Sequence, residues 1–267
     1  IFFQTFQMLS HYPDKAAALK LMRELAQPYP NVPEAHWAVA QLALASGDEA
    51  LALTEIKQAR ALRPKWDIAV SLEAHLLKSH APKQGLEVLR AYLSKYPDAS
   101  EIRLQYARAL LEQKQYKLSR DEFRRLADEA PDNPEMAFAI ALISIQLNDL
   151  QGAEAQLKLA LSKGKKDQDT VQYYLGQLSE AKKNEDEAIE HYREVRDGEH
   201  QFAAQIRIIY LLNKRGQFAE ARQQLHLTQA VDNQQRVQLV LLAAQLLRGA
   251  HQYAAAYHLL KQNLATL

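Results

Sequence analysis

Cysteine is absent from the 267 residues of the chain, which excludes disulfide frameworks, cysteine-ligated zinc and thiol nucleophiles. The sequence also lacks a glycine-rich phosphate loop, a GxSxG nucleophile turn and an HExxH metal motif. The longest apolar run, residues 137–145, is far shorter than the roughly 20 residues that a membrane-spanning helix needs. We therefore expect no catalytic activity, no cofactor and no transmembrane segment in this chain.

Neither basic nor acidic residues are in excess. The 33 lysine and arginine residues balance 32 aspartate and glutamate residues, for a formal net charge of +1. No broad positive field is present to attract nucleic acid, so we expect no nucleic-acid partner. None of the nine histidines has a second histidine four residues further on, the spacing of a helix-borne metal pair. His251 and His258, seven residues apart, are better explained by surface or packing roles, so we expect no metal site.

A period of about 34 residues runs along the chain. Four prolines are separated by 34, 33 and 34 residues, and each follows an amphipathic stretch: Pro30, Pro64, Pro97 and Pro131. Three turn-like tripeptides begin at Gly47, Asn148 and Gly216, and they lie at equivalent points of this period. A fixed period of this length is typical of repeat architectures. The prolines are expected to lie where one helix ends and the next begins.

Within each period the apolar residues fall twice at helical spacing, with a short polar turn between. Residues 33–64 are an example, with Val39, Leu42 and Ala43 on one face and Leu51 and Ile56 on the other. No segment combines sustained alternation with enrichment in β-branched residues, so no strand is expected. The predicted unit is a helical hairpin and the fold class is all-α.

The hairpins resemble the tetratricopeptide repeat. The best match lies in residues 173–195, where Leu175-Gly176 takes the Leu-Gly place, Ala188 the small place and Tyr192 the aromatic place. Seven units can be laid out, starting near residues 33, 66, 100, 134, 169, 202 and 237. The resemblance implies a right-handed superhelical solenoid (an alpha-alpha superhelix) of seven tandem hairpins over residues 31–267. Residues 1–30 are expected to be a partial repeat with a truncated first helix.

Small residues at fixed places predict where paired helices cross. Two helix axes approach to about 8–10 Å only when the side chains at the crossing are small. Gly176 occupies one such place, and the small place of the second helix is taken by Ala52, Ala153, Ala188, Ala221 and Ala256. The pattern has departures: Glu73 and Ile209 stand at the glycine place, and Gly85 and Ser119 at the small place.

The resemblance also implies a binding surface. In this family the fifth, ninth and twelfth positions of each first helix line a concave groove, and here the fifth position is apolar or aromatic in every repeat. The predicted peptide-binding or protein-binding residues are Trp37, Val70, Leu104, Arg108, Phe138, Leu142, Tyr173, Ile206, Tyr210 and Leu241. An alternative is that the fifth-place residues pack between neighbouring repeats. Arg108 alone fits the pattern by which some family members hold a carboxylate.

The expected function is that of a non-catalytic scaffold that binds an apolar peptide or a partner helix in its groove. The irregular, Leu/Ala/Gln-rich repeats also resemble tetratricopeptide lipoproteins of Gram-negative envelopes, some of which deliver substrates to proteases. That likeness implies a periplasmic adaptor anchored to the outer membrane through an upstream segment. The alternative is a structural spacer or oligomerisation module that self-associates through its terminal faces, where Tyr253, Tyr257, Leu260 and Leu264 lie.

Overall fold

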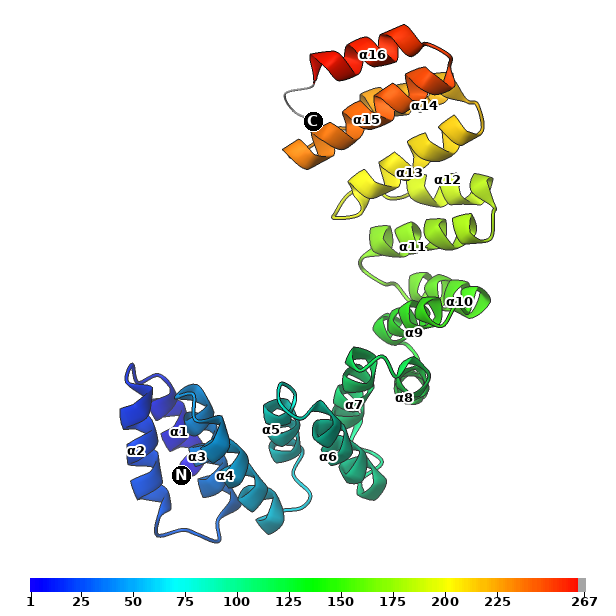
Figure 1. Ribbon diagram of the computed structural model, residues 1–267. Helices are drawn as coiled ribbons and strands as arrows, with labels where there is room; N and C mark the ends of the chain where they lie inside the picture. The colour runs from blue at the N-terminus through cyan, green and yellow to red at the C-terminus, as the bar shows by residue number, and fades with distance from the viewer. Residues whose placement is uncertain (264–267) are drawn as a thin grey trace. The chain divides into compact units, whose positions relative to one another are not determined.

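The computed structural model describes residues 1–263, and this part of the chain is helical throughout, with no strand (Figure 1). The all-α prediction is confirmed. Residues 264–267, which include Leu264 of the predicted last repeat, lie outside the described part. The helices form two compact units, Ile1–Ala130 (unit 1) and Pro131–Leu267 (unit 2, described to residue 263).

Unit 1 is a row of four helical hairpins. Within each hairpin the two helices pack against each other, and the second helix also packs against the first helix of the next hairpin. The helices of unit 1 are α1 (Phe2–Ser10), α2 (Lys15–Ala26), α3 (Pro33–Ala45), α4 (Glu49–Leu62), α5 (Asp67–Leu77), α6 (Pro82–Lys95), α7 (Ser100–Glu112) and α8 (Tyr116–Glu129). Residues 1–30 therefore hold two helices, of which α1 is the short one with 9 residues.

Unit 2 repeats the same arrangement. Its helices are α9 (Pro134–Gln146), α10 (Leu150–Ser162), α11 (Gln168–Ala181), α12 (Glu185–Arg193), α13 (Gln201–Lys214), α14 (Phe218–Leu227), α15 (Asn233–Gly249) and α16 (Tyr253–Gln262). The first helices of six hairpins begin within one residue of the predicted starts. The seventh, α15, begins four residues before the predicted 237 because the Asp232 carboxylate accepts a hydrogen bond from the Gln235 amide, 2.7 Å away, and caps an earlier turn.

The loops follow from local chemistry. Pro64 and Pro97 lie between the end of a second helix and the start of the next hairpin, as the period predicts. Inside the hairpins, Gly47, Asn148 and Gly216 all have positive φ, at 86°, 57° and 75°. This left-handed conformation ends the first helix, because it lets amides beyond the helix donate to its last carbonyls. The three tripeptides therefore mark equivalent turns.

The helix crossings are close where the small residues lie. Ala52, Ala153, Ala188 and Ala221 are fully buried. The Ser119 hydroxyl, in the same place on α8, donates to the Ala107 carbonyl on α7 at 2.8 Å, which measures how near the two helices come. A Cβ atom added to Gly85 would lie 3.2 Å from the Ala74 carbonyl oxygen. Larger side chains at these places would force the helices apart.

Ionic groups take part in the packing between helices. Glu73 stands at the glycine place of α5 and is buried, and it pairs with Arg60 from the preceding hairpin. In unit 2 the Glu180 carboxylate accepts from the Tyr192 hydroxyl at 2.6 Å and from Arg207 Nε at 2.8 Å. Burial, followed by this hydrogen bond, raises the pKa of the Tyr192 phenol. This network joins three helices, α11, α12 and α13.

None of the helices among the described residues has both the length and the apolar character that crossing a bilayer demands.

Candidate functional site

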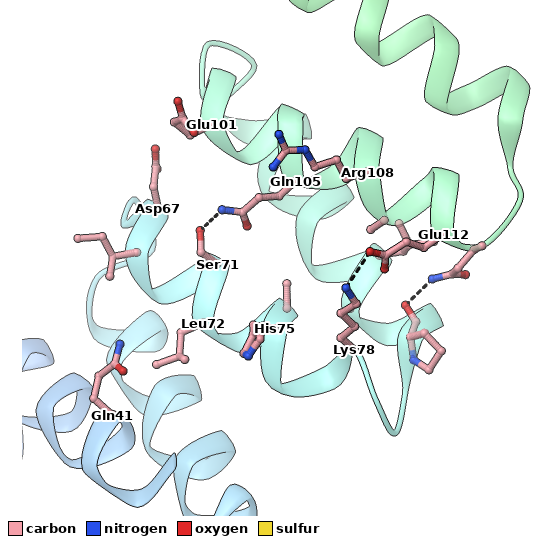
Figure 2. A pocket seen from close by; sticks show the side chains of 17 residues that line it. Gln41, Asp67, Ser71, Leu72, His75, Lys78, Glu101, Gln105, Arg108 and Glu112 are labelled. Atoms are coloured by element: carbon pink, nitrogen blue, oxygen red, sulfur yellow. Dashed lines mark hydrogen bonds and ion pairs between the residues drawn. The ribbon is translucent and has the colours of Figure 1, made fainter. Parts of the chain in front are cut away.

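A groove of about 1070 Å³ opens in unit 1 between α3, α5, α6 and α7 (Figure 2). Its walls mix apolar and polar side chains. The polar lining includes Gln41, Asp67, Ser71, His75, Lys78, Glu101, Gln105, Arg108 and Glu112, and the apolar lining includes Ile68, Leu72, Ala74, Leu86 and Ala109. Pockets that bind ligands typically have about 300–1,000 Å³. The groove is large enough for several residues of a bound chain.

The repeat period places equivalent residues of α5 and α7 side by side along the groove. Ser71 and Gln105 are 34 residues apart, and Gln105 Nε2 donates to Ser71 Oγ at 2.8 Å. Lys78 and Glu112 are also 34 residues apart and form an ion pair at 2.7 Å. Figure 2 shows both contacts bridging the two helices. The register of the repeat thus fixes the groove lining in pairs.

Several charged and ionisable side chains of the groove have no partner in the described part of the chain. Arg108 and Glu101 are exposed on α7, and His75 is exposed on α5; none of the three makes an ion pair or a side-chain hydrogen bond with another residue of 1–263. Asp67 differs, because one carboxylate oxygen accepts from the Tyr92 hydroxyl. Burial, and then this bond, raises the pKa of Tyr92. The free groups are available to a ligand.

The predicted site residues of unit 1 have two different environments. Trp37 and Val70 are buried, and Leu104 is half-buried. The Trp37 ring stacks on Phe3 with centroids 4.4 Å apart and meets Phe6 edge-on. The fifth position thus contributes to packing between hairpins, which corrects the placement of Trp37 and Val70 on an open surface. Arg108 is the predicted residue that lines this groove.

In unit 2 the predicted residues range from half-buried to exposed. Phe138, Leu142, Tyr173 and Ile206 are half-buried, whereas Tyr210 and Leu241 are each 44% exposed. Tyr173 stacks on His200 with centroids 4.4 Å apart, and the Arg207 guanidinium lies 4.9 Å from the centre of the Tyr210 ring. Rings and cations therefore cover much of this row. Its role in binding stays a prediction.

Sequence reasoning missed most of the groove lining. Four of the missed residues lie at the second and sixth positions of the first helices, namely Asp67 and Glu101, and Ser71 and Gln105. A signal was present, since polar residues recur 34 residues apart at these positions. The lining offers hydrogen-bond donors, acceptors and charges for recognition. Among residues 1–263, no group of three or more histidine, aspartate or glutamate side chains is placed to hold a metal ion.

The row of similar hairpins in each unit defines a helical repeat protein. Residues 76–143 and residues 138–204 each match a family model described as tetratricopeptide repeat. Residues 76–204 of the chain therefore contain tetratricopeptide repeats. Repeats of this kind generally serve as protein-binding scaffolds rather than as catalysts, which implies protein partners.

Solved structures with the same fold come from several bacteria. A tetratricopeptide repeat protein from Parabacteroides merdae has a TM-score of 0.56 and 16% identity, covering 88% of this chain and 93% of its own. MamA from Desulfovibrio magneticus has a TM-score of 0.53 and 18% identity, covering 61% and 92%. PilF from Pseudomonas aeruginosa has a TM-score of 0.53 and 16% identity, covering 73% and 90%. At these identities the likeness shows the fold alone. No curated protein matches the chain.

Proposed function

We propose that this chain is a non-catalytic interaction scaffold whose groove in unit 1 binds a peptide segment of a protein partner. The observation that carries the proposal is the groove of about 1070 Å³ with the unpaired side chains Arg108, Glu101 and His75 on its walls. Binding sites combine apolar walls with a few convergent polar groups, and this groove has both.

The ligand suited to this groove combines apolar and polar groups. Ile68 is 46% exposed and offers an apolar contact, while Leu72 and Leu86 are nearly covered. Charged and amide side chains, including Gln41 and Gln105, share the lining with small apolar residues such as Ala74 and Ala109. An apolar peptide would leave these polar groups without water and without partners, which costs free energy. A segment with polar backbone and side-chain groups satisfies them.

Site-specific photo-crosslinking tests the proposal. A photoreactive residue at position 105 lies in the groove, and one at position 117, an exposed site on α8, serves as the matched control. In cells of the source organism we expect a partner to crosslink from position 105 and not from 117. The purified partner should then bind wild-type protein and lose binding to Ser71→Arg, which fills the groove. Equal crosslinking from both positions, or unchanged binding by Ser71→Arg, would contradict the proposal.

The row in unit 2 is a second part of the same proposal. Tyr210 and Leu241 expose 44% of their surface, and exposed tyrosine is a favoured interface anchor. The partner identified above provides the probe: Tyr210→Ser should weaken its binding, with Leu227→Ser, an exposed apolar position on α14, as the control. Binding that is unaffected by Tyr210→Ser would remove this row from the interface.

We further propose a role in a bacterial envelope, as an adaptor that brings substrates to a protease. This rests on the likeness of the irregular repeats to envelope lipoproteins of this family. It is also supported by similar folds such as PilW, described as a type IV pilus biogenesis factor (TM-score 0.52, 16% identity). Fractionation of source cells with an antibody to this chain tests the compartment. Recovery in the cytosolic fraction would exclude the envelope role.

A spacer or self-assembly module is the second candidate function. Tyr253 and Tyr257 on α16 are 60% and 61% exposed, so this hairpin presents two large rings to solvent. Self-association through them should make the molar mass rise with concentration in light scattering, and Tyr257→Glu should abolish that rise. A constant monomer mass across concentrations would rule against this candidate.

A further inference from the structure

The charges of the groove in unit 1 are ordered along it. Asp67 and Glu101 lie near the N-terminal ends of α5 and α7, at one end of the groove (Figure 2). Arg108 is seven residues further along α7, and His75 is eight residues further along α5. At 1.5 Å of rise per residue, Glu101 and Arg108 are separated by about 10 Å along the helix axis.

The remaining charges of the groove do not disturb this order. Lys78 and Glu112 pair with each other at 2.7 Å, so they largely cancel. Asp67 keeps one carboxylate oxygen beyond the one that Tyr92 contacts. The groove therefore has an acidic end and a basic middle, with the Gln105–Ser71 pair between them.

We propose that the groove binds an extended segment of a partner protein that carries one basic and one acidic side chain three residues apart. The inference rests on the proposed function and specifies its ligand. In a polyproline II conformation, an extended form with three residues per turn, side chains three residues apart lie on the same side of the chain and about 9 Å apart, close to the separation of Glu101 from Arg108 along α7. The basic side chain meets Asp67 and Glu101, and the acidic side chain meets Arg108.

Between the charged residues, the groove can contact the side chains and backbone groups of the two intervening peptide residues. Ile68, exposed at 46%, and Leu72 offer an apolar wall to an intervening side chain. The Ser71 hydroxyl and the Gln105 amide oxygen retain hydrogen-bonding capacity for peptide backbone groups. Arg108 can hold a carboxylate in a bidentate geometry. Opposite charges at both ends of the contact also exclude segments with two charges of the same sign.

Blocked synthetic peptides provide the probe. The parent peptide, acetylated and amidated so that it has no terminal charge, reads Gly-Ser-Lys-Leu-Ala-Glu-Ser-Gly. Two variants replace its Lys or its Glu with Gln. Binding to the full chain is measured by calorimetry with wild-type protein, Arg108→Gln, Glu101→Gln and Arg124→Gln, the last being an exposed arginine of α8 outside the groove.

The expected result is a coupling of specific pairs. Arg108→Gln should weaken the parent peptide roughly tenfold and leave the peptide that lacks Glu unchanged, because a double-mutant cycle isolates one contact. Glu101→Gln should likewise weaken binding of the parent peptide and leave binding of the peptide that lacks Lys unchanged. Arg124→Gln should bind all peptides as the wild type does. Binding should also weaken as salt is added.

Two results would overturn the inference, and they differ in what they leave standing. If the parent peptide binds with equal affinity to wild type, Arg108→Gln and Glu101→Gln but not to Ser71→Arg, the groove is a binding site and the charge order plays no part. If no peptide binds at concentrations up to about 1 mM, while the crosslinked partner still requires the groove, the extended bipolar segment is the wrong ligand. If the partner does not require the groove, the proposed function fails as well.

Discussion

Gly176 of α11 lies directly under the ring of Tyr192 of α12. A Cβ atom at position 176 would be 2.6 Å from Tyr192 Cε1 and within 3.0 Å of two further ring atoms. The ring cannot easily move away, because it is 1% exposed and its hydroxyl donates to Glu180 at 2.6 Å. The glycine thus allows a tyrosine to occupy the crossing of the two helices.

Gly176→Ala is therefore expected to destabilise the protein. Alanine is favoured over glycine in a helix by about 1 kcal/mol, but overpacking costs typically 1–3 kcal/mol, and the rigid ring places this site at the upper end. We expect a net loss of about 1–2 kcal/mol by urea denaturation. In a Tyr192→Leu background the same change should be neutral or stabilising. Equal effects in both backgrounds would show that the ring is not the obstacle.

Ala188→Leu probes the same crossing from the other helix. Ala188 is fully buried, so three added carbon atoms must displace a neighbour, at a cost of about 1–3 kcal/mol. Ala155→Leu, at an exposed position of α10, is the control and should change stability by less than about 0.5 kcal/mol. Thermal unfolding followed by circular dichroism compares the two. A melting temperature of Ala188→Leu equal to that of the control would take Ala188 out of the interface.

Lys114→Gly should stabilise the turn between α7 and α8. Lys114 has φ of 58°, a left-handed conformation that costs a residue with a side chain about 1–2 kcal/mol. Its side chain is exposed and makes no hydrogen bond or ion pair within residues 1–263, so little is lost with it. Part of the gain is offset by the greater freedom of glycine in the unfolded chain, which leaves about 0.5–1 kcal/mol. The reverse change, Gly47→Lys, should destabilise its own turn. The midpoints of urea denaturation of both variants are compared with that of wild type. A lower midpoint for Lys114→Gly would contradict the prediction.

Glu154 makes the stability of unit 2 depend on acid pH. Hydrogen bonds from Lys158 and Lys182 lower the pKa of Glu154 from 4.5 to about 2. The pKa of Glu154 is lower in the folded state than in the unfolded state. The contacts of Glu154 with the two lysines therefore stabilise the fold fully above about pH 5, and this stabilisation is lost as the pH falls toward 2. Lys158 is 55% exposed, so solvent screening limits the contribution to about 1 kcal/mol or less.

Glu154→Gln tests this dependence. At pH 7 the variant should be less stable than wild type by up to about 1 kcal/mol, and the difference should vanish near pH 2. Urea denaturation at pH 7, 5 and 3 measures it. Glu190→Gln, an exposed position on α12 without an ion pair in the described part of the chain, controls for the loss of charge. A difference between wild type and Glu154→Gln that does not change with pH would contradict the assigned pKa.

The repeat frame could be predicted from sequence because its signals are local. Proline fixes φ and lacks an amide donor, so the regularly spaced Pro64 and Pro97 mark the ends of helices in any tertiary context. Gly47 and Gly216 indicated the turns inside hairpins for a similar reason. Lys114, Lys183 and His251 occupy the same left-handed place, with φ of 58°, 64° and 60°, but their residue types carry no such signal. The turns they form are imposed by the packing of the helices on either side.

The groove was harder to predict, because an apolar side chain can either pack in the core or lie on an exposed binding surface. Trp37 and Val70 are apolar and lie in the core. The residue that follows the fifth position in α5 and α7, Ser71 or Gln105, is turned by about 100° around the helix and lines the groove. Which of two adjacent positions faces the neighbouring hairpin depends on the tilt between hairpins, and no local signal encodes that angle. The charged lining is therefore a finding of the structure.

Inside either unit, a second helix packs against the first helix of the following hairpin, so the principal contacts in a unit join segments that are adjacent in sequence. A whole hairpin could be duplicated or deleted without remaking the core of distant ones, since the new boundary repeats an existing one. The reach of the array is then adjustable in steps of about 34 residues. In evolution and in engineering alike, modular growth of this kind would lengthen the scaffold while leaving a groove already built between α5 and α7 intact.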